Sequence, residues 1–356
     1  MPVARVVLAA VSGEGRPLLL VLRALGLGDL LTALPALHAL RAAFPSHRLV
    51  LAAPRALAPL AELSGAVGAV ADTAPLAALE PALAGADLAV NLHGRGPQSH
   101  RVLLETHPRR LVAFEHHEVP ESHGGPAWRA DEHEVTRWCR LLAESEIPSD
   151  PARLELPAPA DETLGESGLT ARGAAQAATL IHPGSASPAR RWPPERFAAV
   201  ACAERAEGRP VVVTGSRAET GLAECVARGA GLPDEAMLAG ATDLLGLAAA
   251  VAAADRVVCA DTGVAHLATA LGTPSVVLFG PTSPQHWGPP LARSLHRALW
   301  TGRSGDPHGR ESDAGLLELG VEEVVAALRA LPLRAAPAHG AEGRASAGAR
   351  AASASV

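Results

Sequence analysis

The chain has 356 residues, of which 48% are hydrophobic, and a formal net charge of −6. The length favours two domains of comparable size, and the apolar content is enough for a core in each. The acidic balance argues against a nucleic-acid partner, and no apolar run is long enough to span a bilayer.

Along the first half of the chain, apolar runs of strand length alternate with helical patterns. Residues 1–16 carry too little positive charge to predict a signal peptide. The helix expected over residues 29–44 contains Pro35, which should kink it or leave its first turn irregular. This alternation predicts a parallel sheet with helices on both faces. The strands are expected at residues 17–23, 47–53, 65–72, 86–94 and 109–114.

Proline, acidic and small residues then crowd residues 146–173, which predicts an interdomain linker. A second strand–helix series follows and ends with a helix over residues 320–332. We therefore expect an N-terminal domain, linker included, over residues 1–160 and a C-terminal domain over residues 174–333. Residues 334–356 lack large apolar side chains, so we expect a disordered tail. The strands of the second half are expected at residues 178–184, 209–215, 255–261 and 274–280.

Metal and disulfide chemistry find little support in the sequence. The cysteines show no close pairing, so neither a disulfide framework nor a zinc site is predicted, and a reduced cytoplasmic protein is the default. The histidines of residues 116–133 match no metal-ligand spacing, which favours a solvated loop leading into a helix. No D-x-D sequence offers a pair of carboxylates to a metal. The cysteines are Cys139, Cys202, Cys225 and Cys259.

Two doubly wound domains imply a cleft between them, with ligands beyond the carboxyl ends of the strands. The first loop at such a position is "GLGD", residues 26–29. Gly26 and Gly28 allow a tight turn from strand to helix, and Asp29 stands at the helix start, facing the cleft. Asp29 is either a helix N-cap or a functional carboxylate. The pattern lacks the third glycine of a dinucleotide-binding loop.

The second loop is "HPGSASPARRWPPERF", residues 182–197, directly after the first strand of the second half. Small hydroxyl donors such as Ser185, combined with the fixed charge of Arg190, suit a phosphate group. The alternative is a solvated basic loop in which Trp192 fills the core. The proline after Trp192 stands at the expected first position of a helix.

The third loop is "ADTG", residues 260–263, which opens a helix containing His266. The free N–H groups of the first helical turn, at Thr262 and Gly263, form an anion site. Asp261, at the end of the strand, can accept hydrogen bonds from sugar hydroxyls. A capped helix with a core histidine is the alternative.

Two further positions carry weaker signals. Glu219 follows a strand, where its carboxylate could bind both hydroxyls of a ribose. Thr242 and Asp243 form a helix cap that leaves backbone groups free to contact a base. Either feature could instead be structural.

Taken in chain order, these motifs resemble glycosyltransferase family 9, the ADP-heptose:lipopolysaccharide heptosyltransferases and their relatives. The resemblance is carried by "GLGDLLTALPALHALRAAFP", "NLHG", "HPGSASPARRWPPERF", "VTGSRAE" and "ADTGVAHLATALGTPSVVLFGPTSPQHWGP". It implies an α/β protein of the GT-B fold, in which two Rossmann-like, doubly wound domains face a central cleft. It also implies inversion at the anomeric carbon without a metal or other cofactor.

Carried over residue by residue, the resemblance makes Asp29 the general base. It places the diphosphate on Ser185, Arg190, Thr262 and Gly263, the ribose on Glu219, the base near Thr242 and the sugar on Asp261. His266 matches the histidine of the same motif, and Gly28 and His93 fall on the acceptor side or in the cleft. Arg190 stands where the family usually has Lys, and it keeps the charge and can bind a diphosphate through two hydrogen bonds.

The predicted function is therefore transfer of a heptose-like sugar from a nucleotide diphosphate donor, ADP-heptose by resemblance, in lipopolysaccharide core biosynthesis. The acceptor would be a cell-envelope glycan or glycolipid, and a place at the inner membrane surface is left open. Moving a sugar needs a base for the acceptor hydroxyl and neutralisation of the leaving diphosphate. A non-catalytic nucleotide-sugar binder and a nucleotide-sugar epimerase are the alternatives.

Overall fold

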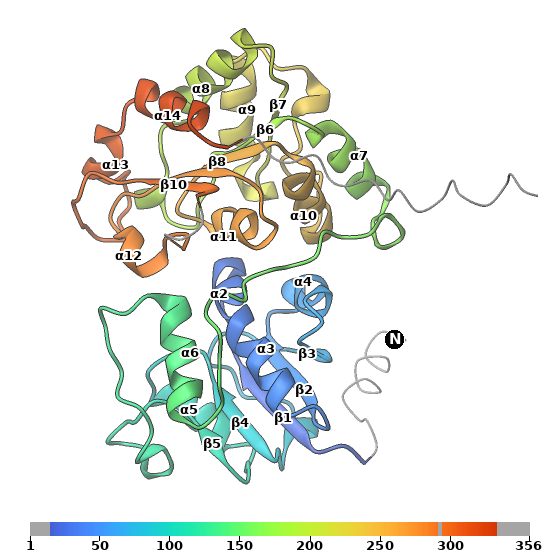
Figure 1. Ribbon diagram of the computed structural model, residues 1–356, viewed down its shortest axis with the longest axis vertical. Coiled ribbons are helices and arrows are strands. Elements are labelled where there is room, and N and C mark those ends of the chain that lie inside the picture. Colours follow the sequence, from blue (N-terminus) through green and yellow to red (C-terminus); the bar gives the residue numbers. More distant parts are fainter. Residues whose placement is uncertain (1–14, 291–293, 333–356) are drawn as a thin grey trace, which may run out of the picture.

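The computed structural model describes residues 15–290 and 294–332, which form two α/β domains (Figure 1). The N-terminal domain is drawn below the C-terminal one, and the helices α2 (Leu27–Thr32) and α11 (Gly263–Ala270) lie at the boundary. Residues 1–14, where no signal peptide was predicted, and residues 334–356, predicted to be a disordered tail, lie outside the described residues. None of the described helices is long and apolar enough to cross a membrane.

The N-terminal sheet is parallel, with the strand order β3-β2-β1-β4-β5. Alternate side chains of β1 enter different cores: Leu19 and Val21 belong to one cluster and Leu20 and Leu22 to another. A strand that is buried on both faces must be apolar throughout, which explains the sequence LLLVL of this strand. The strands are β1 (Leu18–Leu22), β2 (Arg48–Ala53), β3 (Ala69–Asp72), β4 (Leu88–Asn91) and β5 (Leu111–Val112).

The C-terminal sheet is also parallel and has the order β10-β9-β8-β6-β7. Every strand expected from the sequence contains an observed strand, but β10 was not predicted. It forms one edge of this sheet, and the middle of its sequence, Arg297 and Ala298, is exposed, so it lacks an apolar run. The strands are β6 (Thr179–His182), β7 (Val211–Val213), β8 (Arg256–Ala260), β9 (Ser275–Leu278) and β10 (His296–Leu299).

Pro35 divides the predicted helix of residues 29–44 into two. Helix α2 ends at Thr32, and α3 (Leu34–Ala43) begins one residue before Pro35, which therefore stands in a first turn, where its missing N–H costs no helical hydrogen bond. The remaining helices of this domain are α4 (Ala58–Leu63), α5 (Gln98–Leu104) and α6 (Glu134–Glu144).

Part of residues 146–173, where the sequence predicted a linker, forms a helix. Helix α7 (Glu166–Ala175) crosses the expected boundary at residue 174 and packs on α10 (Leu244–Ala253). Its small residues suggested a linker, whereas they serve to bring the two helices close: a Cβ on Gly246 would lie 3.1 Å from the Cα of Gly168. The remaining helices are α8 (Pro194–Ala206), α9 (Thr220–Gly229), α12 (Pro284–Trp287), α13 (Ala314–Glu318) and α14 (Val321–Arg329).

Each sheet has a point at which the strand order reverses, between β1 and β4 in one domain and between β6 and β8 in the other. The connections on the two sides of such a point run to opposite faces, which leaves a crevice beyond the carboxyl ends of the strands. The loops after β1, β6 and β8 are those that the sequence singled out.

The crossing of α7 and α10 gives a prediction about stability. The change Gly246→Val places a branched side chain against the Gly168 backbone, and we expect the free energy of unfolding to fall by about 1–3 kcal/mol. Urea denaturation measures this loss. Gly173→Ala is the matched control, because this exposed position on α7 has no other atom within 4 Å of a new Cβ. The control should be as stable as the parent or slightly more so. Equal urea midpoints for the parent and Gly246→Val would show that the close crossing is not required.

Candidate functional site

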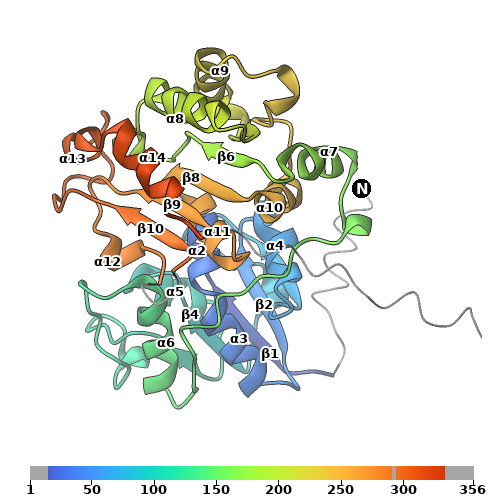
Figure 2. The same ribbon diagram turned by 45° about the horizontal axis from the view of Figure 1, so that its top comes forward.

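The two domains touch where the first turn of α2 meets the first turn of α11 (Figures 1 and 2). The approach is so close that both helices carry a glycine there. A Cβ on Gly263 would lie 2.9 Å from the Cβ of Leu27, and one on Gly28 would lie 2.9 Å from Cδ2 of His266. Glycine, which has no side chain, is the residue that permits such a close approach.

A cavity of about 720 Å³ lies beside this contact and is lined by both domains. It contains the carboxyl-end loops of β1, β6, β7 and β8, so the structure brings most of the predicted site residues together. Those that line the cavity are Gly28, Asp29, Arg190, Glu219, Thr242, Asp261, Thr262, Gly263 and His266. Two predicted residues, Ser185 and His93, are not among its lining residues.

One interpretation of the sequence made Asp29 the N-cap of its helix, and the structure contradicts it. Gly26 occupies the cap, and Asp29 is the third residue of α2, where its Oδ2 accepts a hydrogen bond of 3.1 Å from the Gly26 N–H. Its side chain is 26% exposed and faces the cavity. The carboxylate therefore supports the helix start and remains accessible to a ligand.

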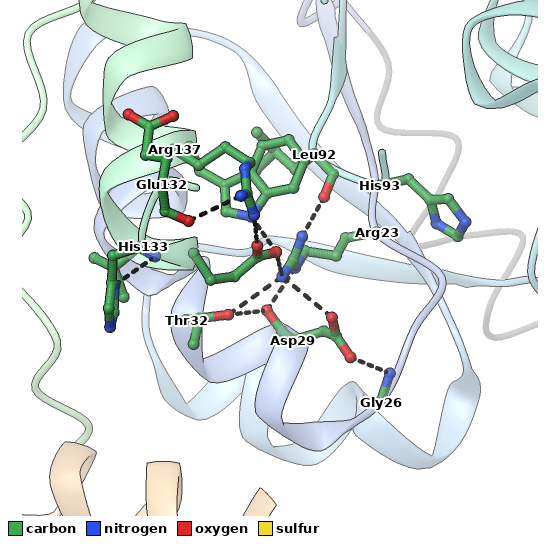
Figure 3. Close-up of polar contacts among 12 residues, drawn as sticks. Arg23, Gly26, Asp29, Thr32, Leu92, His93, Glu132, His133 and Arg137 are labelled. Atoms are coloured by element: carbon green, nitrogen blue, oxygen red, sulfur yellow. Dashed lines mark hydrogen bonds and ion pairs between the residues drawn. The ribbon is translucent and has the colours of Figure 1, made fainter. Parts of the chain in front are cut away.

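Behind Asp29 lies a buried charge network that the sequence did not reveal (Figure 3). The guanidinium of Arg23 is 3.4 Å from Oδ1 of Asp29 and 3.0 Å from Oε1 of Glu134. Glu134 also pairs with Arg137 and accepts a hydrogen bond of 2.8 Å from the Trp138 indole. Arg23 and Glu134 are charged residues that only the fold places at buried positions.

His93 and Gly28 differ in their relation to the cavity. Gly28 lines it, whereas the Nδ1 of His93 accepts a hydrogen bond of 3.2 Å from the Ala24 N–H and so braces the loop after β1. Burial and the nearby charge of Arg23 lower the pKa of His93. At neutral pH this ring is therefore an uncharged support on the N-terminal side.

The C-terminal side of the cavity is built for an anion. Thr262 caps α11 without a side-chain hydrogen bond, so the first N–H groups of that helix are directed at the cavity. Arg190 also lines the cavity and adds a cation, whose Nη1 is 3.5 Å from Oδ2 of Asp261. Free N–H groups and a guanidinium suit a phosphate.

Ser185 supports this arrangement from behind. It is buried, and its hydroxyl donates a hydrogen bond of 3.4 Å to the backbone carbonyl of Asp261. Arg191 in turn donates from Nε to the Ser185 carbonyl at 2.9 Å. These contacts join the loop after β6 to the end of β8 and fix the distance between Arg190 and α11.

Glu219 lies beneath the loop after β6. A Cβ on Gly184 would fall 2.2 Å from Oε1 of Glu219, so the glycine lets the carboxylate lie directly against the loop. Burial acts to raise the pKa of Glu219, but hydrogen bonds from Ser216 and the charges of His182 and Arg191 outweigh it, and the pKa lies below its usual value. The ionised carboxylate can accept hydrogen bonds from hydroxyl groups of a ligand.

The far end of the cavity is apolar. Asp243 caps α10 through a hydrogen bond of 2.7 Å from the Gly246 N–H, as predicted for this pair of residues, and Thr242 stands beside it. Leu244 and Leu247 continue the wall. Leucine side chains in the wall of a cavity can pack against the face of a nucleobase.

His266 lies between the two domains, one turn into α11. Its ring packs edge-on against the Trp287 indole, with 5.9 Å between ring centroids. Removal from water lowers the pKa of His266 to about 4, although the Asp261 carboxylate acts in the opposite direction. The ring is therefore neutral at physiological pH.

The histidine-rich segment is not only a solvated loop. No group of His, Cys, Asp and Glu suited to a metal occurs in the part of the chain that is described, and its cysteines are free thiols. His133, however, caps α6 and reaches the other domain: Nε2 donates a hydrogen bond of 3.0 Å to the carbonyl of Gly288. This interdomain contact was missed, as were the lining residues His182, Trp287 and His308.

Comparisons with known proteins match most of the chain. A sequence model for "Glycosyltransferase family 9 (heptosyltransferase)" matches residues 126–311, which is more than half of the chain. Lipooligosaccharide heptosyltransferase 2 of Haemophilus influenzae is 34% identical over 133 residues. This match covers 34% of the chain and 38% of the relative, so the chain aligns with less than two fifths of that protein's length.

Two solved structures cover more of the chain. A glycosyl transferase family 9 protein from Veillonella parvula superposes with a TM-score of 0.71 at 20% identity, over 88% of this chain and 96% of the other. Escherichia coli ADP-heptose lps heptosyltransferase II gives 0.69 at 21% identity, over 88% and 97%. At such identities the likeness concerns the fold, and it confirms the predicted GT-B architecture.

The low pKa of His266 gives a testable pH dependence. Because the folded pKa is about 4 and the ordinary value is 6.5, the unfolded chain binds more protons between these pH values. Stability contributed by the neutral ring is complete above pH 6.5 and falls as the pH is lowered towards 4. NMR titration should give a midpoint near 4 for this ring, and His266→Gln should remove part of the pH dependence of the unfolding free energy. A midpoint at or above 6.5 would contradict the burial argument.

Proposed function

This chain belongs to glycosyltransferase family 9, and on that premise we propose that it transfers a heptose-like sugar, with inversion and without a metal. The donor is ADP-heptose, and the acceptor is a cell-envelope glycan or glycolipid at the inner membrane surface. The reaction would belong to lipopolysaccharide core biosynthesis. The names of the relatives support this choice of donor and pathway. One observation carries the proposal: a carboxylate from one domain and an anion site from the other line the same cavity.

The anion site is assigned to the leaving diphosphate. As the bond from the anomeric carbon to the donor phosphate breaks, negative charge develops on the diphosphate. The N–H groups at Thr262 and Gly263 and the guanidinium of Arg190 stabilise this charge without a metal ion. Arg190 can bind two phosphate oxygens at once, which compensates for the absence of the lysine that is usual in the family.

The rest of the donor follows from the position of the diphosphate. Glu219 would bind the ribose hydroxyls, and the base would lie against Leu244 and Leu247 beside Thr242. Asp261, which is already held by Arg190, would orient the sugar. Ser185 contributes through the backbone of Asp261 rather than by direct contact.

Asp29 is assigned as the general base. An inverting transfer needs a base on the face of the sugar opposite to the leaving group, and Asp29 faces the C-terminal anion site from the other domain. Residue 29 lies outside the range matched by the family model, so this assignment rests on the resemblance of the residue 26–29 loop and on the geometry. Gly28 and His93 flank it on the acceptor side, His93 through the loop after β1.

Asp29→Asn tests the base. The amide keeps the hydrogen bond from Gly26 but cannot accept a proton, so kcat should fall by about 100-fold or more while the donor Kd changes by less than about threefold. Asp87→Asn is the control: Asp87 forms comparable ion pairs with His47 and Arg109 but precedes β4, at the other end of the sheet. Wild-type turnover in Asp29→Asn would reject the base assignment. Conversion of the donor without any acceptor would instead support an epimerase.

Glu219→Gln tests the donor site. Replacing an ionised acceptor of two hydroxyl groups by a neutral one should weaken ADP-heptose binding by about 10-fold or more, as measured by calorimetry. Glu224→Gln, an exposed change on α9, should leave affinity unchanged. Free ADP should show the same loss as the full donor, since the contact is to the ribose. Unchanged affinity in Glu219→Gln would place the ribose elsewhere.

A further inference from the structure

Arg23 is the first residue after β1 and is 1% exposed. Its guanidinium donates hydrogen bonds to the backbone carbonyls of Asp29 and Leu92, and its Cζ lies 4.9 Å from the centre of the Trp138 ring. A buried guanidinium is costly unless charge and hydrogen bonds compensate it. The structure supplies that compensation from the ends of two neighbouring strands and from α6.

Arg23 holds residue 29 at two points. Its Nε donates to the backbone carbonyl of Asp29, and its Nη2 lies 3.4 Å from Oδ1 of the side chain. Oδ2 of the same carboxylate accepts from the Gly26 N–H. Each carboxylate oxygen thus has one fixed donor, and the carboxylate has a defined orientation towards the cavity. Thr32 adds a further acceptor, 3.2 Å from Nη2.

Glu134 fixes Arg23 in turn. Oε1 of Glu134 lies 3.0 Å from Nη2 of Arg23. Burial acts to raise the pKa of Glu134, but the guanidiniums of Arg23 and Arg137 outweigh it and keep the pKa below its usual value. The buried ions therefore balance, with two guanidiniums and two carboxylates when Asp29 is included (Figure 3).

The neighbouring residue connects this network to the other domain. His133 accepts a hydrogen bond of 3.2 Å from the Val135 N–H at Nδ1, so its proton is on Nε2, which donates to the Gly288 carbonyl. Gly288 follows Trp287, which packs on His266 at the anion site. The start of α6 thus contacts the C-terminal domain through His133 and, through Glu134, the arginine that holds Asp29.

We propose that Arg23 and Glu134 are positioning residues for Asp29, and that the His133–Gly288 hydrogen bond links the position of Asp29 to the position of the C-terminal domain relative to the N-terminal one. The inference rests on the proposed function, in which Asp29 is the base. A misplacement of a reacting group by about 1 Å can cost on the order of 100-fold in rate, so loss of these contacts should lower kcat and spare donor binding.

Arg23→Lys tests the first part. Lysine keeps one charge but cannot contact Asp29, Glu134 and the carbonyls together, so kcat should fall by about 10- to 100-fold while the donor Kd changes by less than about twofold. Arg140→Lys is the matched control, since Arg140 on α6 forms a comparable two-bond ion pair with Glu132 and lies over Phe114, away from Asp29. It should lower the melting temperature without lowering kcat.

Thr32→Val provides a second variant should Arg23→Lys fold poorly. It removes one acceptor of Arg23 at nearly constant volume, and we expect a smaller fall in kcat of about 3- to 10-fold. Glu134→Gln should resemble Arg23→Lys in lowering kcat and not the donor affinity. An unchanged kcat in well-folded Arg23→Lys and Glu134→Gln would overturn the positioning role.

A double-mutant cycle separates this inference from the proposed function. If Arg23 acts through Asp29, adding Arg23→Lys to Asp29→Asn should lower kcat no further. A further fall by the full factor would show that Arg23 acts independently and would overturn the inference. If Asp29→Asn alone keeps wild-type turnover, the base assignment itself is wrong and the proposed function fails first.

His133→Asn tests the coupling. Asparagine is a good N-cap and replaces the Nδ1 acceptor, but it is too short to reach Gly288. We expect kcat to fall by about 10-fold with the melting temperature nearly retained, and no additional fall in the Arg23→Lys background. Wild-type kcat in His133→Asn, with a reduced kcat in Arg23→Lys, would overturn the coupling to the C-terminal domain.

Discussion

The site depends on the contact between the first turns of α2 and α11. Two glycines, Gly28 and Gly263, let one helix start from each domain approach within van der Waals distance. Because both helices begin directly after a strand at a point where strand order reverses, each carries its domain's ligand-binding loop to the same place. Close packing of these two helix starts therefore sets how the two domains meet beside the cavity.

The two sides of the cavity differ in charge because two similar helix starts are occupied differently. Both helix starts direct free N–H groups and a partial positive charge inward. In α2 the carboxylate of Asp29 lies at this positive end, and its Oδ2 accepts a hydrogen bond from the N–H of the cap residue Gly26. In α11 the cap residue Thr262 makes no side-chain hydrogen bond, so the positive end is left for a ligand, and Arg190 reinforces it. A carboxylate on one side and a helix start with an added guanidinium on the other therefore line the same cavity, although the two backbones are alike.

Much of this arrangement could be predicted from sequence because it is local. The glycines, Asp29, Arg190 and the Asp261–Gly263 loop each follow a strand whose apolar run is visible, and loops after parallel strands meet at one edge. The Arg23–Glu134 pair could not be found in this way, since its members are 111 positions apart and only tertiary packing joins them. Helix α7 was not predicted for a related reason: its small residues resemble a linker unless α10 is known to pack against them.

Burying a charged side chain costs free energy, and the chain contains two contrasting examples of buried ion pairs. Glu204 is fully buried, and Arg209 and Thr179 compensate it at the base of the C-terminal sheet, far from the cavity lining. That pair joins α8 to the β6–β7 region, and neither of its residues lines the cavity. The Arg23 network has the same cost but ends at a carboxylate that is partly exposed to the cavity. Since apolar residues could fill the same volume at lower cost, a charged network that ends at the site is best explained by what it orients.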